Sequence, residues 1–210
     1  QFKNDTYLVF TVKVEKVLKK DAKEADSTFR KRAGEFFQKD YQESIAKKKG
    51  AEEGKIKAYV ADNNLKTTTT PSGLQYIISA PGNAERVVEG DRATVNYTGS
   101  LTKKDAKGKY PIFDTSDEKL AKAENKFQPG RPYGPTKMAV GGTIPGFTEA
   151  LKLIGKGGKI KVIIPSKLGY GEQGAMQAGI MPYSPIVFDL EITDIKKGTA
   201  PQPVAVPPTK

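Results

Sequence analysis

The sequence predicts an α+β protein in which a helical N-terminal arm precedes a strand-rich domain. Between residues 26 and 64, apolar residues recur at three- and four-residue steps, which is the spacing of one helix face. After residue 73, β-branched residues dominate short segments bounded by Gly and Pro. One short helix is clear among these strands, at about residues 147–153, so the second region is expected to be mainly sheet.

The first residues of the chain have the pattern of a strand. Residues 7–17 alternate between apolar and polar side chains, which predicts a strand within segment 1–20. Residues 6–17 also align with residues 184–195, with alternation in step. Two interpretations remain open: the segment is the last strand of a preceding module of a longer parent protein, or it is a plain extra strand.

Segment 21–66 is predicted to be a helical arm. Asp26 or Ser27 can act as the N-cap, and the apolar spacing continues to a second, shorter helix that ends near residues 63–64. Residues 67–73 contain four threonines, a proline and a glycine, which is typical of a linker. We therefore expect a domain boundary there, with a second domain over residues 74–197.

Four strands are predicted in the second domain, at residues 74–79, 92–99, 158–165 and 185–195. Residues 101–135 form a long polar segment that is expected to be helical only around 118–124. The C-terminal residues 198–210 are rich in proline, which predicts an extended, disordered tail.

The composition excludes several classes of chemistry. The 210 residues contain no cysteine, histidine or tryptophan. This excludes thiol nucleophiles, Ser-His-Asp triads, disulfides and almost every zinc or copper site. No apolar run approaches the roughly 18 residues that a membrane span needs. Any reaction must therefore use carboxylates, tyrosines, lysines, backbone groups or the shape of a pocket.

The net charge of +11 is spread along the chain rather than concentrated. Residues 1–66 carry +5, residues 67–195 carry +3 and the last fifteen residues carry +3, with acidic residues interleaved in the first two regions. The densest run, Lys47-Lys48-Lys49, ends a predicted helix, where cations also favour the helix dipole. We expect a solvated basic surface and no nucleic-acid partner, with a basic nucleic-acid binder as the rival interpretation.

One glycine-rich motif is misleading. Residues 169–174 satisfy G-x-G-x-x-G, and Asp189 follows at the spacing of a dinucleotide-binding fingerprint. That motif must open a helix, but prolines at 182 and 185 leave no room for one. A loop beside a pocket is the better interpretation.

Several segments in a fixed order carry a family resemblance. They are VNYTGSL (95–101), FDTS (113–116), IPGFTEAL (144–151), IPSKLGYGEQG (164–174) and IVFDLEI (186–192). Over about residues 72–196 the chain resembles the FKBP family of peptidyl-prolyl cis–trans isomerases, and the helical N-terminal region is similar to the bacterial envelope-located branch. The resemblance implies a curved antiparallel β-sheet wrapped around a short helix.

The resemblance also implies a proline pocket, lined by Tyr97, Phe113, Asp114, Ile144, Phe147, Tyr170 and Phe188. In such a pocket the Ile144 N–H and the Tyr170 hydroxyl bind substrate carbonyl groups, and Asp114 accepts a hydrogen bond from Tyr97. Met181, in the loop that caps the pocket, is also implied to contact substrate. Taken singly, each aromatic residue would instead be assigned to the hydrophobic core.

The chain departs from the family pattern at the pocket walls. Phe147 stands where the family often has Trp, and Thr136 and Met138 stand where it has paired aromatics. One wall therefore loses aromatic surface, which bears on substrate preference and on macrolide inhibitor binding. The segments 101–112 and 115–135 are long for the family and are expected to reshape access to the pocket.

The function implied is isomerisation of X–Pro bonds in unfolded or partly folded proteins, without covalent catalysis, metal or cofactor. A non-catalytic FKBP-like chaperone or binding module remains the alternative. The arm carries an apolar stripe, which predicts a homodimer or client contacts, formed by Phe29, Phe36, Phe37 and Tyr41. The resemblance and the absence of cysteine favour a periplasmic or cell-envelope location.

Overall fold

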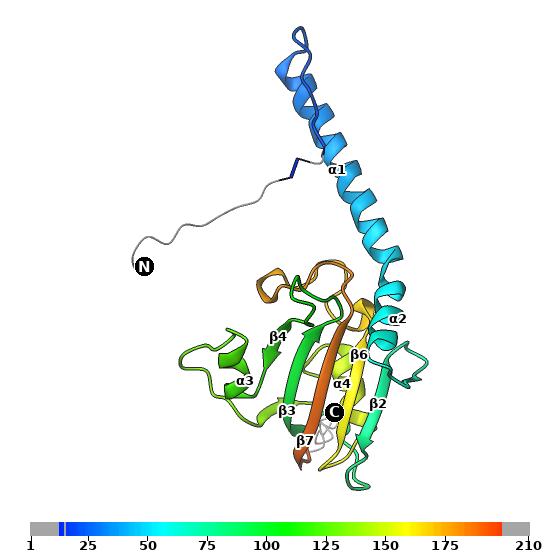
Figure 1. Cartoon of the computed structure of the whole chain (residues 1–210), viewed down its shortest axis with the longest axis vertical. Helices are drawn as coiled ribbons and strands as arrows, with labels where there is room; N and C mark the ends of the chain where they lie inside the picture. Colours follow the sequence, from blue (N-terminus) through cyan, green and yellow to red (C-terminus); the bar gives the residue numbers. More distant parts are fainter. Residues whose placement is uncertain (1–12, 15, 199–210) are drawn as a thin grey trace, which may run out of the picture. The chain divides into compact units, whose positions relative to one another are not determined.

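The structure is a computed structural model that describes residues 13, 14 and 16–198 (Figure 1). Contacts divide the chain into two units, residues 1–44 and residues 45–210. No helix within the described residues has both the length and the apolar character needed to cross a membrane. Nearly all of the proline-rich tail, residues 199–210, lies outside them.

The first unit contains most of helix α1 (Asp26–Gly50). The predicted caps Asp26 and Ser27 both lie inside the helix, and the first helical bond goes from the Phe29 N–H to the Ala25 carbonyl. Residues 16–24 are bound to this helix by ion pairs. Arg32 lies 2.6 Å from Glu24, and Lys16 pairs with Asp40. Because the segment covers only part of the helix, Phe37 and Tyr41 keep 60% and 53% of their surface exposed.

The strand predicted at residues 7–17 is wrong where it can be compared. Residues 7–12 and 15 lie outside the described residues, and residues 13, 14, 16 and 17 are in no strand. Val14 and Val17 are 71% and 68% exposed. An alternating segment becomes a strand only when a neighbouring strand completes its hydrogen bonds, and here ion pairs bind its described continuation to a helix instead.

The second unit is built on one antiparallel sheet with strands in the order β1-β2-β6-β7-β3-β4, and β5 pairs beside β3. The four predicted strands are confirmed to within two residues at each end, as β2, β3, β6 and β7. The structure adds three short strands that the sequence did not predict. The bounds are β1 (Thr68–Thr69), β2 (Gln75–Ala80), β3 (Arg92–Leu101), β4 (Ile112–Thr115), β5 (Thr136–Ala139), β6 (Lys159–Ile164) and β7 (Ile186–Lys196).

The main core lies between the sheet and helix α4 (Pro145–Leu153), as the prediction of a sheet around one short helix requires. Residues of β3 alternate between buried and partly exposed, and Val95 and Tyr97 face this core. Phe147 and Leu151 of α4 pack against them. The short helix α3 (Glu118–Ala123) occupies the long polar segment near its predicted position.

Helix α2 (Glu52–Asp62) packs into the second unit and is not part of a separate arm. Its buried residues Ile56 and Tyr59 cluster with Ile163 of β6 and Val187 of β7. These two strand residues alternate with inward-facing neighbours, so α2 covers one end of the opposite face of the sheet. The predicted arm of residues 21–66 therefore ends, as a separate unit, at Ser44.

The predicted linker 67–73 is also part of this unit. Thr68 and Thr69 form β1, which pairs with Tyr76 and Gln75 of β2. The Ser72 hydroxyl lies 2.8 Å from a carboxylate oxygen of Glu149 on α4. Tertiary hydrogen bonds thus override a composition that is typical of flexible segments.

Truncation tests this boundary. Deleting residues 1–66 removes Ile56 and Tyr59, whose burial contributes about 3–6 kcal/mol to the free energy of unfolding, and it exposes Ile163 and Val187. Deleting residues 1–44 leaves these contacts intact. We expect thermal unfolding to show a large fall in Tm for the first variant and little change for the second, and equal Tm values would contradict the packing of α2.

Candidate active site

Four aromatic rings meet at the edge of the main core. Tyr97 comes from β3, Phe113 from β4, Phe147 from α4 and Phe188 from β7. The Phe188 ring centroid lies 5.1 Å from that of Phe147, 5.4 Å from that of Phe113 and 6.3 Å from that of Tyr97, with the rings edge to face. Such T-shaped contacts suit the quadrupoles of the rings, so the group is a rigid apolar surface.

A glycine allows these rings to meet. Gly99 pairs with Phe188 across β3 and β7. A Cβ atom at Gly99 would lie 2.5 Å from the Phe113 ring and 2.7 Å from the Phe188 ring. Since real side chains do not approach so closely, any larger residue at this position would push the rings apart.

The polar wall of the site is a hydrogen-bonded triad. The Tyr97 hydroxyl donates to Asp114 Oδ2 at 2.9 Å. Arg131 Nη1 lies 2.7 Å from Asp114 Oδ1, and Arg131 Nη2 donates to the Tyr97 hydroxyl at 2.7 Å. Burial, followed by the Asp114 charge, raises the pKa of Tyr97 to about 12, and the hydrogen bond to Asp114 raises the pKa of Arg131.

Arg131 is a site residue that the sequence did not predict. It lies in the long segment between β4 and β5, 34 residues from Tyr97. Its guanidinium carbon lies 5.4 Å from the ring centroid of Tyr133, and this ring stacks on Phe127 at 5.4 Å. Nothing local in the sequence indicates these contacts, because they depend on how the long segment folds.

Two hydrogen-bond donors at the site lack a protein partner within the described residues. The Ile144 carbonyl accepts from Phe147 and Thr148 at the start of α4, but the Ile144 N–H donates to none of the described acceptors. The Tyr170 hydroxyl is likewise unpaired there, and Tyr170 is half-buried. Burial, followed by the Asp114 charge, raises the pKa of Tyr170 above its usual value.

The structure thus brings six of the predicted residues into one cluster, with Ile144 and Tyr170 packed beside the buried rings. Asp114 joins them through Tyr97. Met181 does not belong to this cluster and is 45% exposed. Met138 packs against the core, while Thr136 bonds to the Gly134 carbonyl, so neither replaces an aromatic wall.

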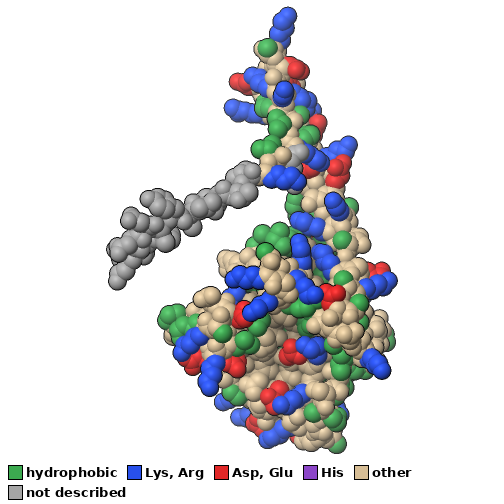
Figure 2. All heavy atoms as spheres, in the orientation of Figure 1, with side chains coloured by type: hydrophobic (Ala, Val, Ile, Leu, Met, Phe, Trp, Pro, Cys, Tyr) green, Lys and Arg blue, Asp and Glu red, His purple; other side chains and the backbone are tan. Residues whose placement is uncertain are grey.

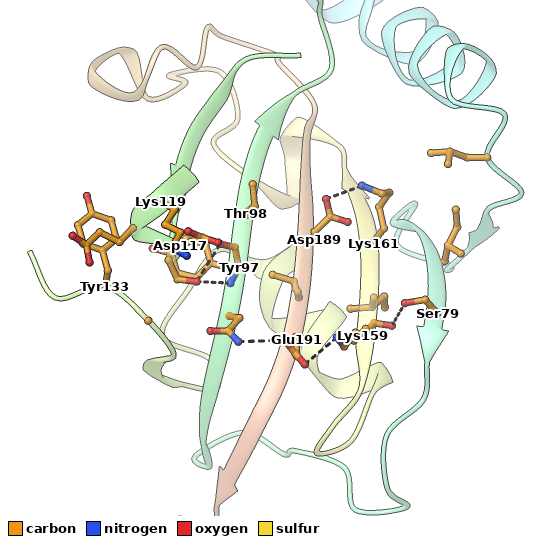
Figure 3. A pocket seen from close by; sticks show the side chains of 18 residues that line it. Ser79, Tyr97, Thr98, Asp117, Lys119, Tyr133, Lys159, Lys161, Asp189 and Glu191 are labelled. Carbon is orange, nitrogen blue, oxygen red and sulfur yellow. Dashed lines mark hydrogen bonds and ion pairs between the residues drawn. The ribbon is translucent and has the colours of Figure 1, made fainter. Parts of the chain in front are cut away.

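A groove of about 1010 Å³ lies mainly over the other face of the sheet, and Tyr97 is among the residues that line it (Figure 3). Its charged side chains pair across the strands. Lys161 lies 2.7 Å from Asp189, and Lys159 lies 3.2 Å from Glu191. Since these groups neutralise one another on an open surface, we assign the groove to the solvated side of the sheet and place the site on the aromatic cluster.

A family model for FKBP-type peptidyl-prolyl cis-trans isomerases matches residues 83–193, which is more than half of the chain. The chain therefore belongs to this family. The matched region includes the aromatic cluster, the triad and the two unpaired donors. The family resemblance and the fold class that the sequence predicted are confirmed.

Relatives extend the similarity beyond the matched region. A probable FKBP-type peptidyl-prolyl cis-trans isomerase of Haemophilus influenzae is 39% identical over 73% of this chain and 55% of its own length. The Escherichia coli isomerase FkpA is 36% identical over 75% of this chain and 45% of its own length. The crystal structure of FkpA from Escherichia coli superposes with a TM-score of 0.59 at 32% identity, covering 84% of this chain and 76% of that chain. The chain spans about half the length of the curated relatives it matches.

Titration of Tyr97 tests the triad. Burial, followed by the negative charge of Asp114, raises the pKa of Tyr97 from its usual 10 to about 12, because both disfavour the phenolate. Asp114→Asn removes that charge, so we expect the pKa to fall toward 10 in NMR titrations of labelled tyrosine. Asp189→Asn, on the other face of the sheet, should leave it unchanged. An unshifted Tyr97 pKa in Asp114→Asn would show that the triad is not formed in solution.

Proposed function

We propose that this chain accelerates cis–trans isomerisation of X–Pro bonds in unfolded or partly folded proteins. One observation carries the proposal: a rigid aromatic cluster stands beside two donors, the Ile144 N–H and the Tyr170 hydroxyl, that are unpaired within the described residues. An apolar ring and two carbonyl groups of an extended peptide match these features. Membership of the isomerase family supports the assignment.

The chemistry needs a shaped environment and no nucleophile. Rotation about the X–Pro bond breaks amide resonance and has a barrier of about 18–20 kcal/mol. The twisted amide is less dipolar than the planar one, so an apolar surface favours it over the ground state. We propose that the rings of Phe113, Phe147 and Phe188 hold the proline, while the two donors fix the flanking carbonyl groups.

Asp114 acts in this mechanism as a positioning residue. Both of its carboxylate oxygens are engaged, since Oδ2 accepts from Tyr97 and Oδ1 lies against Arg131 and the Thr115 N–H. It is therefore poorly suited to take a proton from a substrate. Its role is to hold the Tyr97 ring and the long segment against the pocket.

An isomerisation assay on a proline peptide tests the proposal. The wild-type chain at micromolar concentration should accelerate the reaction. Phe147→Ala and Asp114→Ala should each lower kcat/KM by about 10-fold, the second through loss of hydrogen bonds worth about 1.5–3 kcal/mol to the charged group.

Lys161→Gln is the matched control, because this side chain pairs with Asp189 away from the site. It should retain full activity, and circular dichroism should show that all variants are folded. If the wild-type chain does not accelerate the reaction, the proposed isomerase activity is overturned and a non-catalytic binding module is favoured.

We further propose that the exposed apolar residues of α1 join two copies of the chain or hold client proteins. Phe37 and Tyr41 support this, because exposed aromatic rings one helical turn apart are costly to leave in water. Light scattering should show a dimer for the wild-type chain and a monomer for Phe37→Glu. Gln38→Glu adds the same charge beside this face and should remain dimeric. If the wild-type chain is monomeric, we infer that the exposed face binds client proteins.

The location and the small-molecule partners stay proposals. The absence of cysteine and the family resemblance support a periplasmic or cell-envelope location. The aromatic cluster is also the site proposed for macrolide inhibitors, at reduced affinity because Thr136 and Met138 present little aromatic surface. The even spread of charge along the chain supports the absence of a nucleic-acid partner.

A further inference from the structure

Lysine side chains gather beside residues 169–185, which include the site residue Tyr170. We call residues 169–185 the pocket loop. Three segments meet there, residues 45–62, 102–110 and 169–185, and together they hold nine lysines and five carboxylates. Figure 2 shows basic side chains (Lys and Arg, blue), with acidic ones among them, at the end of the sheet where α2 lies. We call Lys48, Lys55 and Lys103 the basic rim.

Lys55 connects this rim to the pocket loop. Its Nζ donates to the Tyr183 carbonyl at 3.4 Å. The Tyr183 N–H donates to the Gly171 carbonyl at 3.0 Å, next to the site residue Tyr170. The ammonium group of Lys55 is thus separated from the pocket by the width of one loop.

The hairpin 102–110 adds Lys103 to the rim. Tyr110 packs edge to face on Tyr59 at 4.7 Å, and Lys104 lies 2.8 Å from Asp62, so the hairpin is held against α2. Burial lowers the pKa of Lys55, and the charges of Lys103 and Lys48 lower it further against the opposing effect of Glu52. Lys48 and Lys103 therefore each repel the ammonium group of Lys55.

The carboxylates of the same three segments are engaged elsewhere. Their partners are Ser166 for Glu52, Lys57 for Glu53, Lys104 and Tyr110 for Asp62, backbone N–H groups of the hairpin for Asp105, and the Tyr183 hydroxyl for Glu172. Within the described residues, none of the rim lysines lies within ion-pair distance of a carboxylate. Glu52 acts on Lys55 without forming an ion pair with it, so the rim keeps a net positive charge.

We propose that the basic rim binds acidic side chains of the client chain whose proline occupies the pocket. This rests on the proposed function, and it names the substrate class: X–Pro bonds followed or preceded by acidic residues. Lys55 bonds to Tyr183, and Tyr183 bonds to Gly171 beside Tyr170. An extended client advances about 3.3–3.6 Å per residue, so residues close to its proline reach the rim. A client held in the pocket presents such residues at high effective concentration, which favours a polypeptide over a lipid surface or a nucleic acid.

Two peptides that differ only in flanking charge test the inference. One carries Asp at the three positions before Ala-Pro and at the three positions after it, and the other carries Ser at the same positions. At low ionic strength, the wild-type chain should show a KM about 3- to 10-fold lower for the acidic peptide, with similar kcat, because the rim acts on binding alone. The difference should shrink as salt is added.

Lys55→Gln combined with Lys103→Gln should abolish this KM difference and leave turnover of the Ser peptide unchanged. The matched control is Lys137→Gln combined with Lys196→Gln, which removes the same charge on β5 and at the last residue of β7. It should keep the difference. An equal effect of both double variants, or no preference in the wild-type chain, would overturn the inference.

A binding assay separates this inference from the proposed function. Fluorescence anisotropy of a labelled Asp-rich peptide without proline measures binding to the rim even if no isomerisation is observed. Lys55→Gln combined with Lys103→Gln should weaken that binding. Loss of turnover on both peptides would contradict the proposed function alone. Rim-dependent binding to phosphatidylglycerol vesicles or to poly(U), without any peptide preference, would overturn the acidic-client assignment.

Discussion

The antiparallel pairing of β3 with β7 is the constraint on which the site depends. It places Gly99 opposite Phe188 and Tyr97 opposite Leu190. Since side chains alternate along a strand, a shift of one residue would turn Tyr97 out of the core and put a Cβ atom between the rings of Phe113 and Phe188. The aromatic cluster is thus a consequence of register, and its rigidity comes from the same core that stabilises the fold.

The long segment between β4 and β5 contributes to the site through Arg131. α3 and the stacked rings of Phe127 and Tyr133 order this segment, and Arg131 then reaches both Asp114 and Tyr97. The aromatic cluster, where we propose that a proline binds, is therefore supported by an ion pair at its polar wall. Because the ion pair is satisfied internally, it can orient the rings without attracting a charged ligand into the pocket.

Helix α2 links the two faces of the sheet. Its apolar residues cover Ile163 and Val187, its Glu52 bonds to Ser166, and its Lys55 reaches the pocket loop. This one helix therefore buries apolar residues of the sheet and also places the Lys55 ammonium group beside the pocket loop. The positive charge that looks diffuse along the sequence becomes local only where α2, the 102–110 hairpin and the pocket loop meet.

The sequence by itself determined the long strands, α4 and six residues of the cluster, because these follow from local periodicity and from motifs in a fixed order. Tertiary structure decided the rest. β1, β4 and β5 have two to four residues and are stabilised only by their neighbours. Residues 67–73 are not a free linker, and residues 13, 14, 16 and 17 of the predicted first strand are in no strand. Partners far along the chain, and not composition, set the conformation of such segments. Arg131 and the basic rim escaped prediction for the same reason: their contacts join residues 17 to 128 positions apart.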